Sequence, residues 1–205
     1  MKNAATSDPE GLLRRAKAGD REALGLLLEL YRNYLELLAR MQIGRRLRGK
    51  VDAADLIQET YLAAYRDFGR FRGKTEPELL SWLRQILAYN LSDMVRRYCG
   101  AQRRDIRLER RLGEELEQSS RTLEGGLVAC ASSPSQRAVR REQAVLLADA
   151  LRTLPADYSE VLFLHYLQGL TFPEVSRRMG RTLDSVKKLW VRALARLRQN
   201  MGGAS

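Results

Sequence analysis

Apolar residues recur at steps of three and four residues through most of this chain, as in the stretch 24–38. That spacing places them on one face of an amphipathic helix, and no alternating strand pattern competes with it. Helices are predicted over residues 9–18, 21–41, 53–69 and 78–98. Asp52 is the predicted N-cap of the third helix, a basic stretch at 45–50 precedes it, and residues 71–77 form a loop. These four helices predict one helical domain over residues 10–100.

The apolar pattern weakens between residues 101 and 136. Charges alternate from Arg103 to Glu117, and glycine and serine residues then follow without a sustained apolar face. This composition is typical of a linker. Apolar periodicity resumes at Val139 and continues to about residue 201. We therefore predict an all-α chain in which two small helical domains, 10–100 and 137–201, are joined by a flexible linker at 101–136.

The second domain carries the signals of a helix-turn-helix. A short helix is predicted over 158–167, and Thr171 and Glu174 then fit a capping box at the start of the next helix. Gly180 ends that helix, and Thr182 caps a longer one that runs to about residue 199. A short helix, a tight turn with glycine and a longer helix are the elements of a helix-turn-helix.

Charge strengthens this interpretation. The chain has 36 Lys and Arg against 25 Asp and Glu, a formal net charge of +11, which indicates a polyanionic partner. Residues 171–198 hold eight basic and two acidic residues, hence more than half of that net charge. The candidate DNA-contacting residues are Arg181, Thr182, Ser185, Lys187, Lys188 and Arg192. The alternative is a solvated basic face on a structural hairpin. Trp190 lies on the apolar stripe and is assigned to the core.

Several classes of protein are disfavoured. The chain has no run of 18 apolar residues and no apolar secretory segment, so neither membrane insertion nor secretion is expected. The two cysteines, Cys99 and Cys130, lack metal-ligand spacing, and His165 is the single histidine. We expect a cytoplasmic protein, and the single histidine disfavours a histidine metal cluster or a catalytic triad.

Four positions on the third predicted helix share one outer face. Asp55, Gln58, Glu59 and Leu62 stand at i, i+3, i+4 and i+7. In isolation such a face is usually a solvated surface. Here it is followed in order by the Phe-Gly-Arg-Phe-Arg-Gly segment at 68–73, Trp82-Leu83 and the Asp-Met-Val-Arg-Arg segment at 93–97.

This order of motifs, together with the stretch from Leu154-Pro155 to Leu197-Arg198, resembles bacterial sigma factors of the extracytoplasmic-function group. These proteins are the initiation subunits of RNA polymerase. The resemblance covers residues 10–100 as region 2 and 137–200 as region 4. It implies a promoter-specificity factor with no active site of its own, whose linker threads into the polymerase channel toward the RNA exit. It also implies, as a further partner, an anti-sigma protein.

The resemblance assigns roles to residues at matching positions. The face bearing Asp55, Gln58, Glu59 and Leu62 resembles the surface that docks on the clamp helices of the largest polymerase subunit. Region 4 is expected to contact the minus-35 element through the basic residues named above. The residues expected to open and contact the minus-10 element are Lys74, Trp82, Tyr89, Asn90, Arg96 and Arg97.

Some assignments stay open at this point. Trp82 also fits the apolar spacing of a core residue, and Arg96 and Arg97 fit a solvated helix end. Many family members have Asn where Tyr89 stands, so either Tyr89 or Asn90 could contact the minus-10 base. Leu183-Asp184 also departs from the residues that are common at the start of the family's recognition helix, so the minus-35 preference is not inferred.

Two other functions compete with this interpretation. The first is a free-standing, dimeric helix-turn-helix regulator that binds symmetric half-sites without polymerase. The second is an enzyme acting on nucleic acid, with Asp52, Asp55 and Glu59 as Mg²⁺ ligands.

Overall fold

The computed structural model describes residues 8–46, 52–99, 106–125 and 134–202, and this part of the chain contains helices and no strand. The chain divides into two compact units, Met1–Arg121 and Thr122–Ser205. The predicted all-helical, two-domain fold is confirmed. Residues 47–50 of the basic stretch and both cysteine side chains lie outside the described part of the chain.

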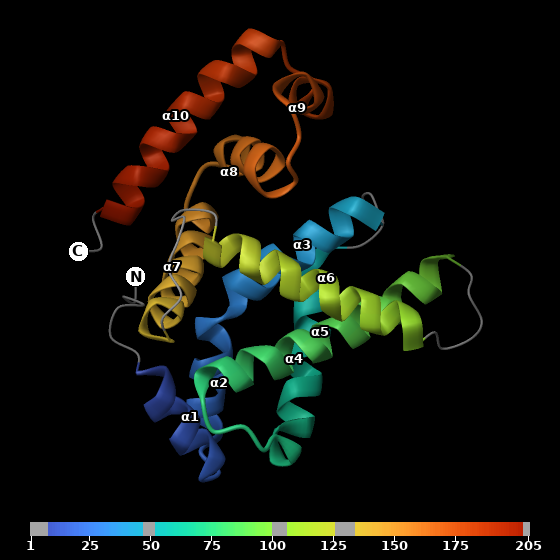
Figure 1. The fold of residues 1–205 in the computed structure, drawn as a ribbon, viewed down its shortest axis with the longest axis vertical. Coiled ribbons are helices and arrows are strands. Elements are labelled where there is room, and N and C mark those ends of the chain that lie inside the picture. Colours follow the sequence, from blue (N-terminus) through green and yellow to red (C-terminus); the bar gives the residue numbers. More distant parts are fainter. Residues whose placement is uncertain (1–7, 47–51, 100–105, 126–133, 203–205) are drawn as a thin grey trace. The chain divides into compact units, whose positions relative to one another are not determined.

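The first unit contains the helices predicted for region 2 and one more (Figure 1). They are α1 (Pro9–Lys17), α2 (Arg21–Leu30), α3 (Arg32–Arg46), α4 (Ala53–Asp67), the 3₁₀ turn η2 (Phe68–Arg70), α5 (Glu76–Cys99) and α6 (Ile106–Gly125), whose last four residues fall in the second unit. Aspartates fix three of the starts. Asp20 accepts a hydrogen bond from the backbone N–H of Ala23 at 2.9 Å, and Asp52 accepts one from Ala54 at 3.0 Å. These N-caps satisfy donors that the first helical turn leaves unpaired.

The segment predicted as one helix over 21–41 is two helices that meet at Tyr31. The ring of Tyr31 is 1% exposed, and its hydroxyl donates to Glu76 Oε1 at 2.7 Å, where α5 begins. Leucines continue at helical spacing on both sides of the break, so the apolar pattern does not reveal it. The break at Tyr31 therefore accompanies a hydrogen bond that pairs the hydroxyl of this buried side chain with Glu76.

The core of the first unit is built mainly from leucines of α2 to α5. Leu27, Leu35, Leu56 and Leu83 are fully buried. Tyr61 of α4 donates its buried hydroxyl to the carbonyl of Leu28, which ties α4 to α2, and burial raises the pKa of this phenol. This packing presents the opposite side of α4 to solvent.

Helix α6 corrects the expectation for part of the linker. Residues 106–125, predicted to lack a sustained apolar face, form a 20-residue helix. Its buried residues are Leu112, Leu116, Ser119, Ser120 and Leu123. The two serines interrupt the row of leucines, which is why the apolar pattern failed to indicate the helix.

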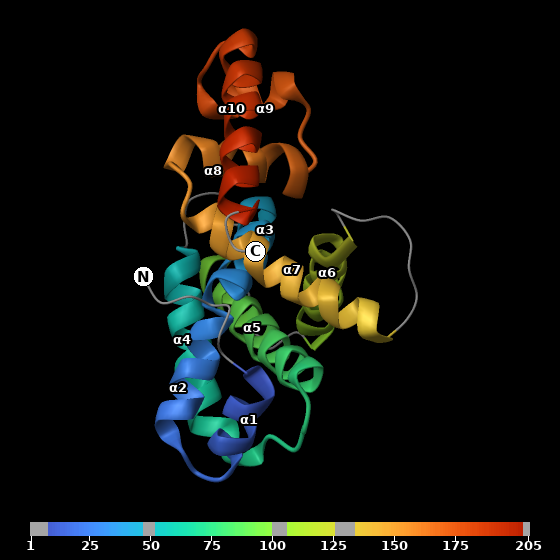
Figure 2. The ribbon, with the colours of Figure 1, turned by 90° about the vertical axis from the view of Figure 1, so that its left-hand side faces the viewer.

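The second unit contains the predicted helix-turn-helix (Figure 2). Its elements are α7 (Pro134–Arg152), α8 (Ala156–Leu162), the π-helical segment η3 (Phe163–Leu167), α9 (Phe172–Met179) and α10 (Leu183–Gly202). The predicted capping box and the predicted N-cap are confirmed. The Glu174 carboxylate accepts from the N–H of Thr171 at 2.8 Å, and the Thr182 hydroxyl accepts from the N–H of Ser185 at 3.2 Å. Gly180 ends α9 with φ of 62°, a conformation that favours glycine.

Candidate functional site

The outer face of α4 is exposed as the spacing predicts. Asp55, Gln58 and Glu59 are exposed, and the side chain of Leu62 is 65% exposed. Tyr65 follows on the same side and is 43% exposed. A Cβ atom on Gly25 would lie 2.7 Å from the Tyr65 hydroxyl, so this phenol passes close to the backbone of α2. The face combines carboxylates, an amide and an unusually exposed leucine.

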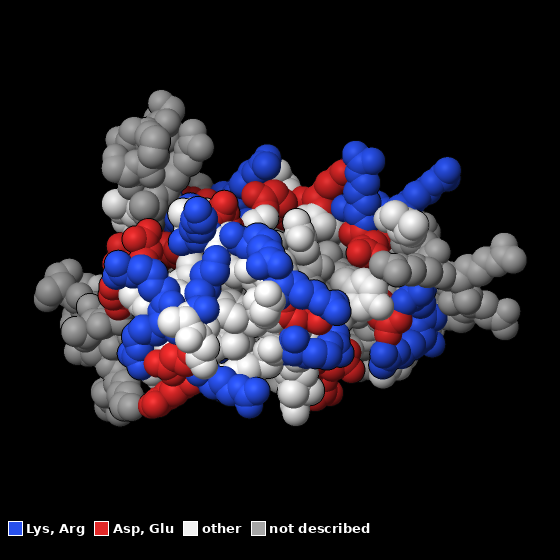
Figure 3. All heavy atoms as spheres, turned by 90° about the horizontal axis from the view of Figure 1, so that it is seen from below, with Lys and Arg blue, Asp and Glu red and all other residues white. Residues whose placement is uncertain are grey.

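A groove of about 790 Å³ continues from Leu62 between the α1–α2 turn, the end of α4 and η2. Its walls combine apolar and basic side chains, a property that sequence analysis missed because the groove joins three separate segments. The lining side chains include Lys17, Arg21, Leu24, Leu62, Tyr65, Arg66, Phe68, Phe71 and Arg72. Figure 3 looks onto this end of the first unit and shows Lys and Arg side chains around an uncharged centre.

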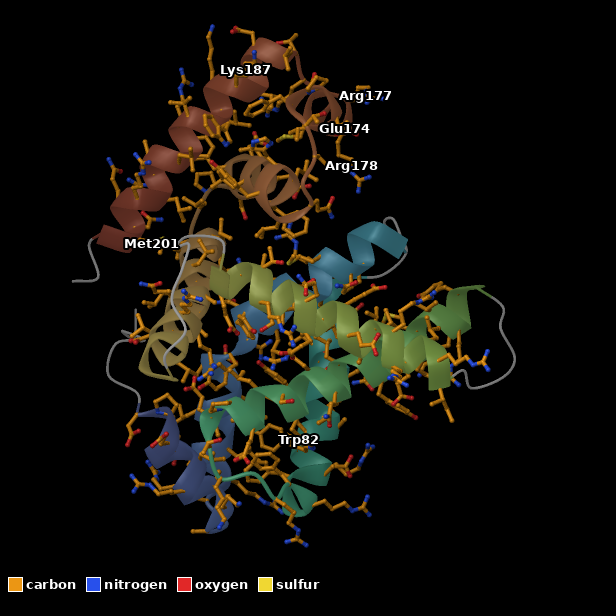
Figure 4. All side chains as sticks on the ribbon, in the orientation of Figure 1. Trp82, Glu174, Arg177, Arg178, Lys187 and Met201 are labelled. Carbon is orange, nitrogen blue, oxygen red and sulfur yellow. The ribbon has the colours of Figure 1, made fainter. Side chains whose placement is uncertain are left out.

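Trp82 packs in an aromatic cluster. Its ring centroid lies 5.0 Å from that of Phe71 and 6.1 Å from that of Phe68, and the residue is half-buried within the first unit (Figure 4). Trp82 therefore packs against other aromatic side chains, as the alternative assignment of this residue to the core expects. The cluster anchors the loop at 71–75 against the start of α5.

The loop is also held by charged residues. Lys17 donates to the carbonyl of Gly73 at 2.6 Å. Glu78 accepts from the backbone N–H of Lys74 at 2.7 Å and of Thr75 at 3.0 Å, and these hydrogen bonds lower the pKa of Glu78. Lys74 itself is exposed, as a residue that contacts DNA must be.

The neighbours Tyr89 and Asn90 differ in exposure. Tyr89 is 41% exposed. Asn90 is only 9% exposed, and its amide donates to the Thr60 hydroxyl of α4 at 3.2 Å. Tyr89 is therefore the member of the pair whose side chain is accessible to a base.

Arg96 and Arg97 at the end of α5 both pair with Asp93. Arg96 is half-buried in this pair, whereas the Arg97 side chain is 64% exposed. Arg97 also lies 3.8 Å from Glu59 on α4. The two predicted surfaces of region 2 thus meet at this arginine.

The second unit presents a basic surface along α9 and α10. Arg177 and Arg178 of α9 and Lys187 of α10 are exposed and project from their helices (Figure 4). Lys188 pairs with Asp184 at 2.8 Å, and Arg181 pairs with Asp157 at 2.5 Å. The remaining candidates are Thr182 and Arg192, which are exposed, and Ser185, which is half-buried.

Aromatic rings brace the turn before α9. His165 stacks on Phe172 with centroids 4.3 Å apart, and the edge of Trp190 lies against it at 6.0 Å. The His165 ring also bonds to the Leu170 carbonyl at 2.8 Å. Trp190 is half-buried, in agreement with its assignment to the core, and the single histidine serves packing.

The metal hypothesis finds no support in the described part of the chain, which holds no group of three or more potential ligands. Asp52 caps α4 and is committed to the N–H of Ala54. Among the helices that the structure describes, none has the length and apolar character needed to span a bilayer.

Comparison with known families finds a match in each of the two units. The family described as Sigma-70 region 2 matches residues 30–99, and the one described as Sigma-70, region 4 matches residues 144–197. The chain belongs to the sigma-70 family. It is a sigma factor of the extracytoplasmic-function group, because its relatives are named as such. Region 2 and region 4 in one chain disfavour the free-standing dimeric regulator.

Two relatives and one solved structure illustrate the similarity. The sigma factor SigD of Mycobacterium tuberculosis is 28% identical over 95% of this chain and 84% of its own length. BldN of Streptomyces coelicolor is 32% identical over 91% of this chain and 64% of its own length. A chain in the structure of the RsbN–BldN complex is 26% identical, covers 91% of this chain and 96% of its own, and superposes with a TM-score of 0.32.

Proposed function

We propose that this sigma factor uses surfaces of opposite charge, an acidic one for core polymerase and basic ones for promoter DNA. The observation that carries the proposal is the exposed α4 face with Asp55, Gln58, Glu59 and Leu62 on a protein of net charge +11. Carboxylates repel DNA phosphates, so this face suits a basic protein partner. The clamp helices of the largest polymerase subunit are the proposed partner.

Leu62 supports the same assignment. A leucine that is 65% exposed on a helix gains hydrophobic stabilisation only when a partner covers it. Apolar residues at the centre of an interface contribute much of its affinity, while surrounding charges set the approach and the register. Leu62 lies one turn beyond Glu59 and two turns beyond Asp55 on this face, so the face combines an apolar contact with charges.

Among the residues predicted to act at the minus-10 element, we assign DNA contact to the exposed side chains. The more buried ones are assigned to holding those side chains in position. Tyr89 offers an accessible ring on which an unstacked base can stack, and Lys74 and Arg97 offer charges for phosphates. Trp82, Asn90 and Arg96 position these groups. Trp82 does so through Phe71, and Asn90 through Thr60.

For the minus-35 element the proposal places the N-terminal half of α10 in the major groove. The exposed Lys187, Lys188 and Arg192 supply cations for phosphates or guanine edges. Thr182 and Ser185 sit at the helix start, where a recognition helix meets the bases. Arg181 is held by Asp157 and is available to a phosphate once that pair opens.

The remaining assignments concern setting and regulation. The factor is proposed to work in the cytoplasm, to hold no cofactor and to leave the chemistry to the polymerase. An anti-sigma protein is proposed as a second partner, because an exposed docking face with Leu62 and Tyr65 needs cover when polymerase is absent.

The test is run-off transcription with purified core polymerase on promoter fragments, together with a direct measurement of core affinity. Asp55→Lys should weaken core binding at least tenfold, because it places a like charge against a basic partner. Glu142→Lys makes the same charge change at an exposed site of α7 and should bind normally. Unchanged affinity of the Asp55 variant would remove α4 as the docking surface. Specific retention of DNA duplexes without polymerase would instead support the independent regulator.

A further inference from the structure

The side of α10 that faces away from the core begins with an acidic residue. Val186 and Ala193 of this helix are fully buried. The helical repeat therefore places Asp184, Lys188 and Val191 on the opposite side, where all three are exposed. Asp184 is the second residue of α10 and lies in the part of a recognition helix that contacts base edges. We call these three residues the outer stripe of α10.

Basic residues flank the outer stripe on both sides. A rotation of about 100° per residue places Lys187 and Arg192 on opposite flanks, and both are exposed (Figure 4 shows Lys187). With α10 in the major groove, these two cations suit the phosphates of the two strands, and the outer stripe then meets the base edges between them. Val191 is 57% exposed and supports this orientation, because an aliphatic side chain gains from a thymine methyl group and not from a phosphate.

An acidic residue at this place restricts the bases that it can face. The ionised Asp184 carboxylate accepts hydrogen bonds and cannot donate them. Among base edges in the major groove, only the amino groups of cytosine and adenine are donors. Guanine and thymine present acceptors, which a carboxylate repels, and the phosphates repel it as well. Asp184 therefore lowers the affinity for duplex DNA in general and favours sites that offer it an amino group.

The partner of Asp184 selects between the two bases that carry an amino group. Lys188 Nζ lies 2.8 Å from Asp184 Oδ2, so the outer stripe presents a donor directly beside an acceptor. A G·C pair presents the complementary order, with the acceptors N7 and O6 of guanine next to the N4 amino group of cytosine. An A·T pair offers a single acceptor on each side of its amino group. The ammonium therefore finds two acceptors on a G·C pair and one on an A·T pair.

We propose that the Asp184–Lys188 pair recognises one G·C base pair of the minus-35 element, with Lys188 on guanine and Asp184 on cytosine. The inference rests on the proposed function, which places α10 on that element. The pair sets sequence preference, whereas Lys187 and Arg192 supply affinity that does not depend on sequence.

Transcription from a promoter library tests this assignment. The library holds all four base pairs at each position of the minus-35 element, and holoenzyme is assembled from purified core polymerase and the full chain. Asp184→Ala and Lys188→Ala each remove one half of the pair. Glu142→Ala is the matched control, because it removes an exposed carboxylate from α7 of the same unit.

The wild-type holoenzyme should prefer G·C over every other base pair at one position by about fivefold or more, the discrimination expected of a good base contact. Both variants of the pair should lose most of that preference at the same position and keep the preferences elsewhere. Asp184→Ala should also raise transcription from the other three promoters at that position, because a repulsive charge is gone. The control should reproduce the wild type.

A purely structural role of the pair predicts a different result. If the pair only stabilises α10, either variant lowers transcription from all promoters equally and leaves the base preference unchanged, and this outcome would overturn the inference. Changes at two different positions, or a preferred A·T pair, would overturn it as well. If the wild-type holoenzyme transcribes no promoter of the library, the proposed function itself fails, whereas transcription without a preferred G·C pair removes only the inference.

Discussion

Tyr89 and Asn90 are neighbours on α5, yet we assign DNA contact to Tyr89 and a structural role to Asn90. Asn90 connects α5 to α4 through Thr60, whose hydroxyl in turn donates to the Leu56 carbonyl at 2.8 Å. Tyr89 lies one residue away, and its ring is 41% exposed. Substitution of each should therefore affect a different property of the protein.

Asn90→Ala should destabilise the first unit by about 1–2 kcal/mol, because it removes a buried hydrogen bond. Tyr89→Ala should leave stability unchanged and reduce promoter opening, with Tyr89→Phe as the control that keeps the ring. Urea unfolding followed by Trp82 fluorescence in a Trp190→Phe background measures the first effect, and permanganate reactivity of unpaired thymines measures the second. Loss of opening with Asn90→Ala at full stability would reverse the assignment of the pair.

Glu174 predicts a pH dependence at the start of α9. Hydrogen bonds from the Thr171 hydroxyl and backbone N–H lower the pKa of this carboxyl below its ordinary value of 4.5. Because the folded pKa is depressed, the stabilisation is present above pH 4.5 and is lost as the pH falls through the folded pKa. An NMR titration should show a low Glu174 pKa in the native chain and a rise toward the ordinary value in Thr171→Ala. Identical titrations of the two proteins would contradict the capping role.

At the scale of elements, the turn between α9 and α10 depends on one residue. Gly180 has φ of 62°, and no atom lies within 4 Å of a Cβ placed there. Gly180→Ala should therefore destabilise the second unit by about 1 kcal/mol through backbone strain alone. Asn tolerates this conformation better, so Gly180→Asn should cost less. Trp190 fluorescence during urea unfolding, in a Trp82→Phe background, compares the variants, and equal midpoints for Ala and Gly would contradict the prediction.

The elements that sequence predicted are those with a local physical signal. The α4 start at Asp52, the capping box at Thr171 and the αL turn at Gly180 each depend on neighbours within a few residues. The exposed face of α4 followed in the same way from helical spacing. Local chemistry of this kind is readable without knowledge of the tertiary fold.

The features that sequence did not predict depend on contacts between distant residues. Helix α6 uses Ser119 and Ser120 against α3, which no apolar period marks. The break at Tyr31 depends on Glu76, and the burial of Asn90 depends on Thr60. Each of these features could be predicted only with knowledge of where the contacting residue lies in the folded chain.

For the whole molecule, the net charge of +11 predicts promoter affinity that falls steeply with salt. Each phosphate neutralised contributes about 0.9 to the slope of log affinity against log salt concentration. Lys187→Ala, which removes an exposed cation of α10, should lower that slope by about 1 without changing the preferred minus-35 sequence. Binding of holoenzyme to promoter DNA at several salt concentrations measures it. An unchanged slope would show that Lys187 contacts no phosphate.

Arg97 gives the two surfaces of region 2 a means of cooperativity. It lies 3.8 Å from Glu59, which the proposed function assigns to polymerase, while Arg97 itself is assigned to a phosphate. One guanidinium nitrogen cannot fully serve both, so engagement of Glu59 by polymerase releases Nη1 of Arg97 toward DNA while Nη2 keeps its pair with Asp93. Exposed pairs of this kind are worth at most about 1 kcal/mol, which limits the gain to about fivefold. By linkage, promoter DNA would strengthen the hold of this sigma factor on polymerase by the same factor.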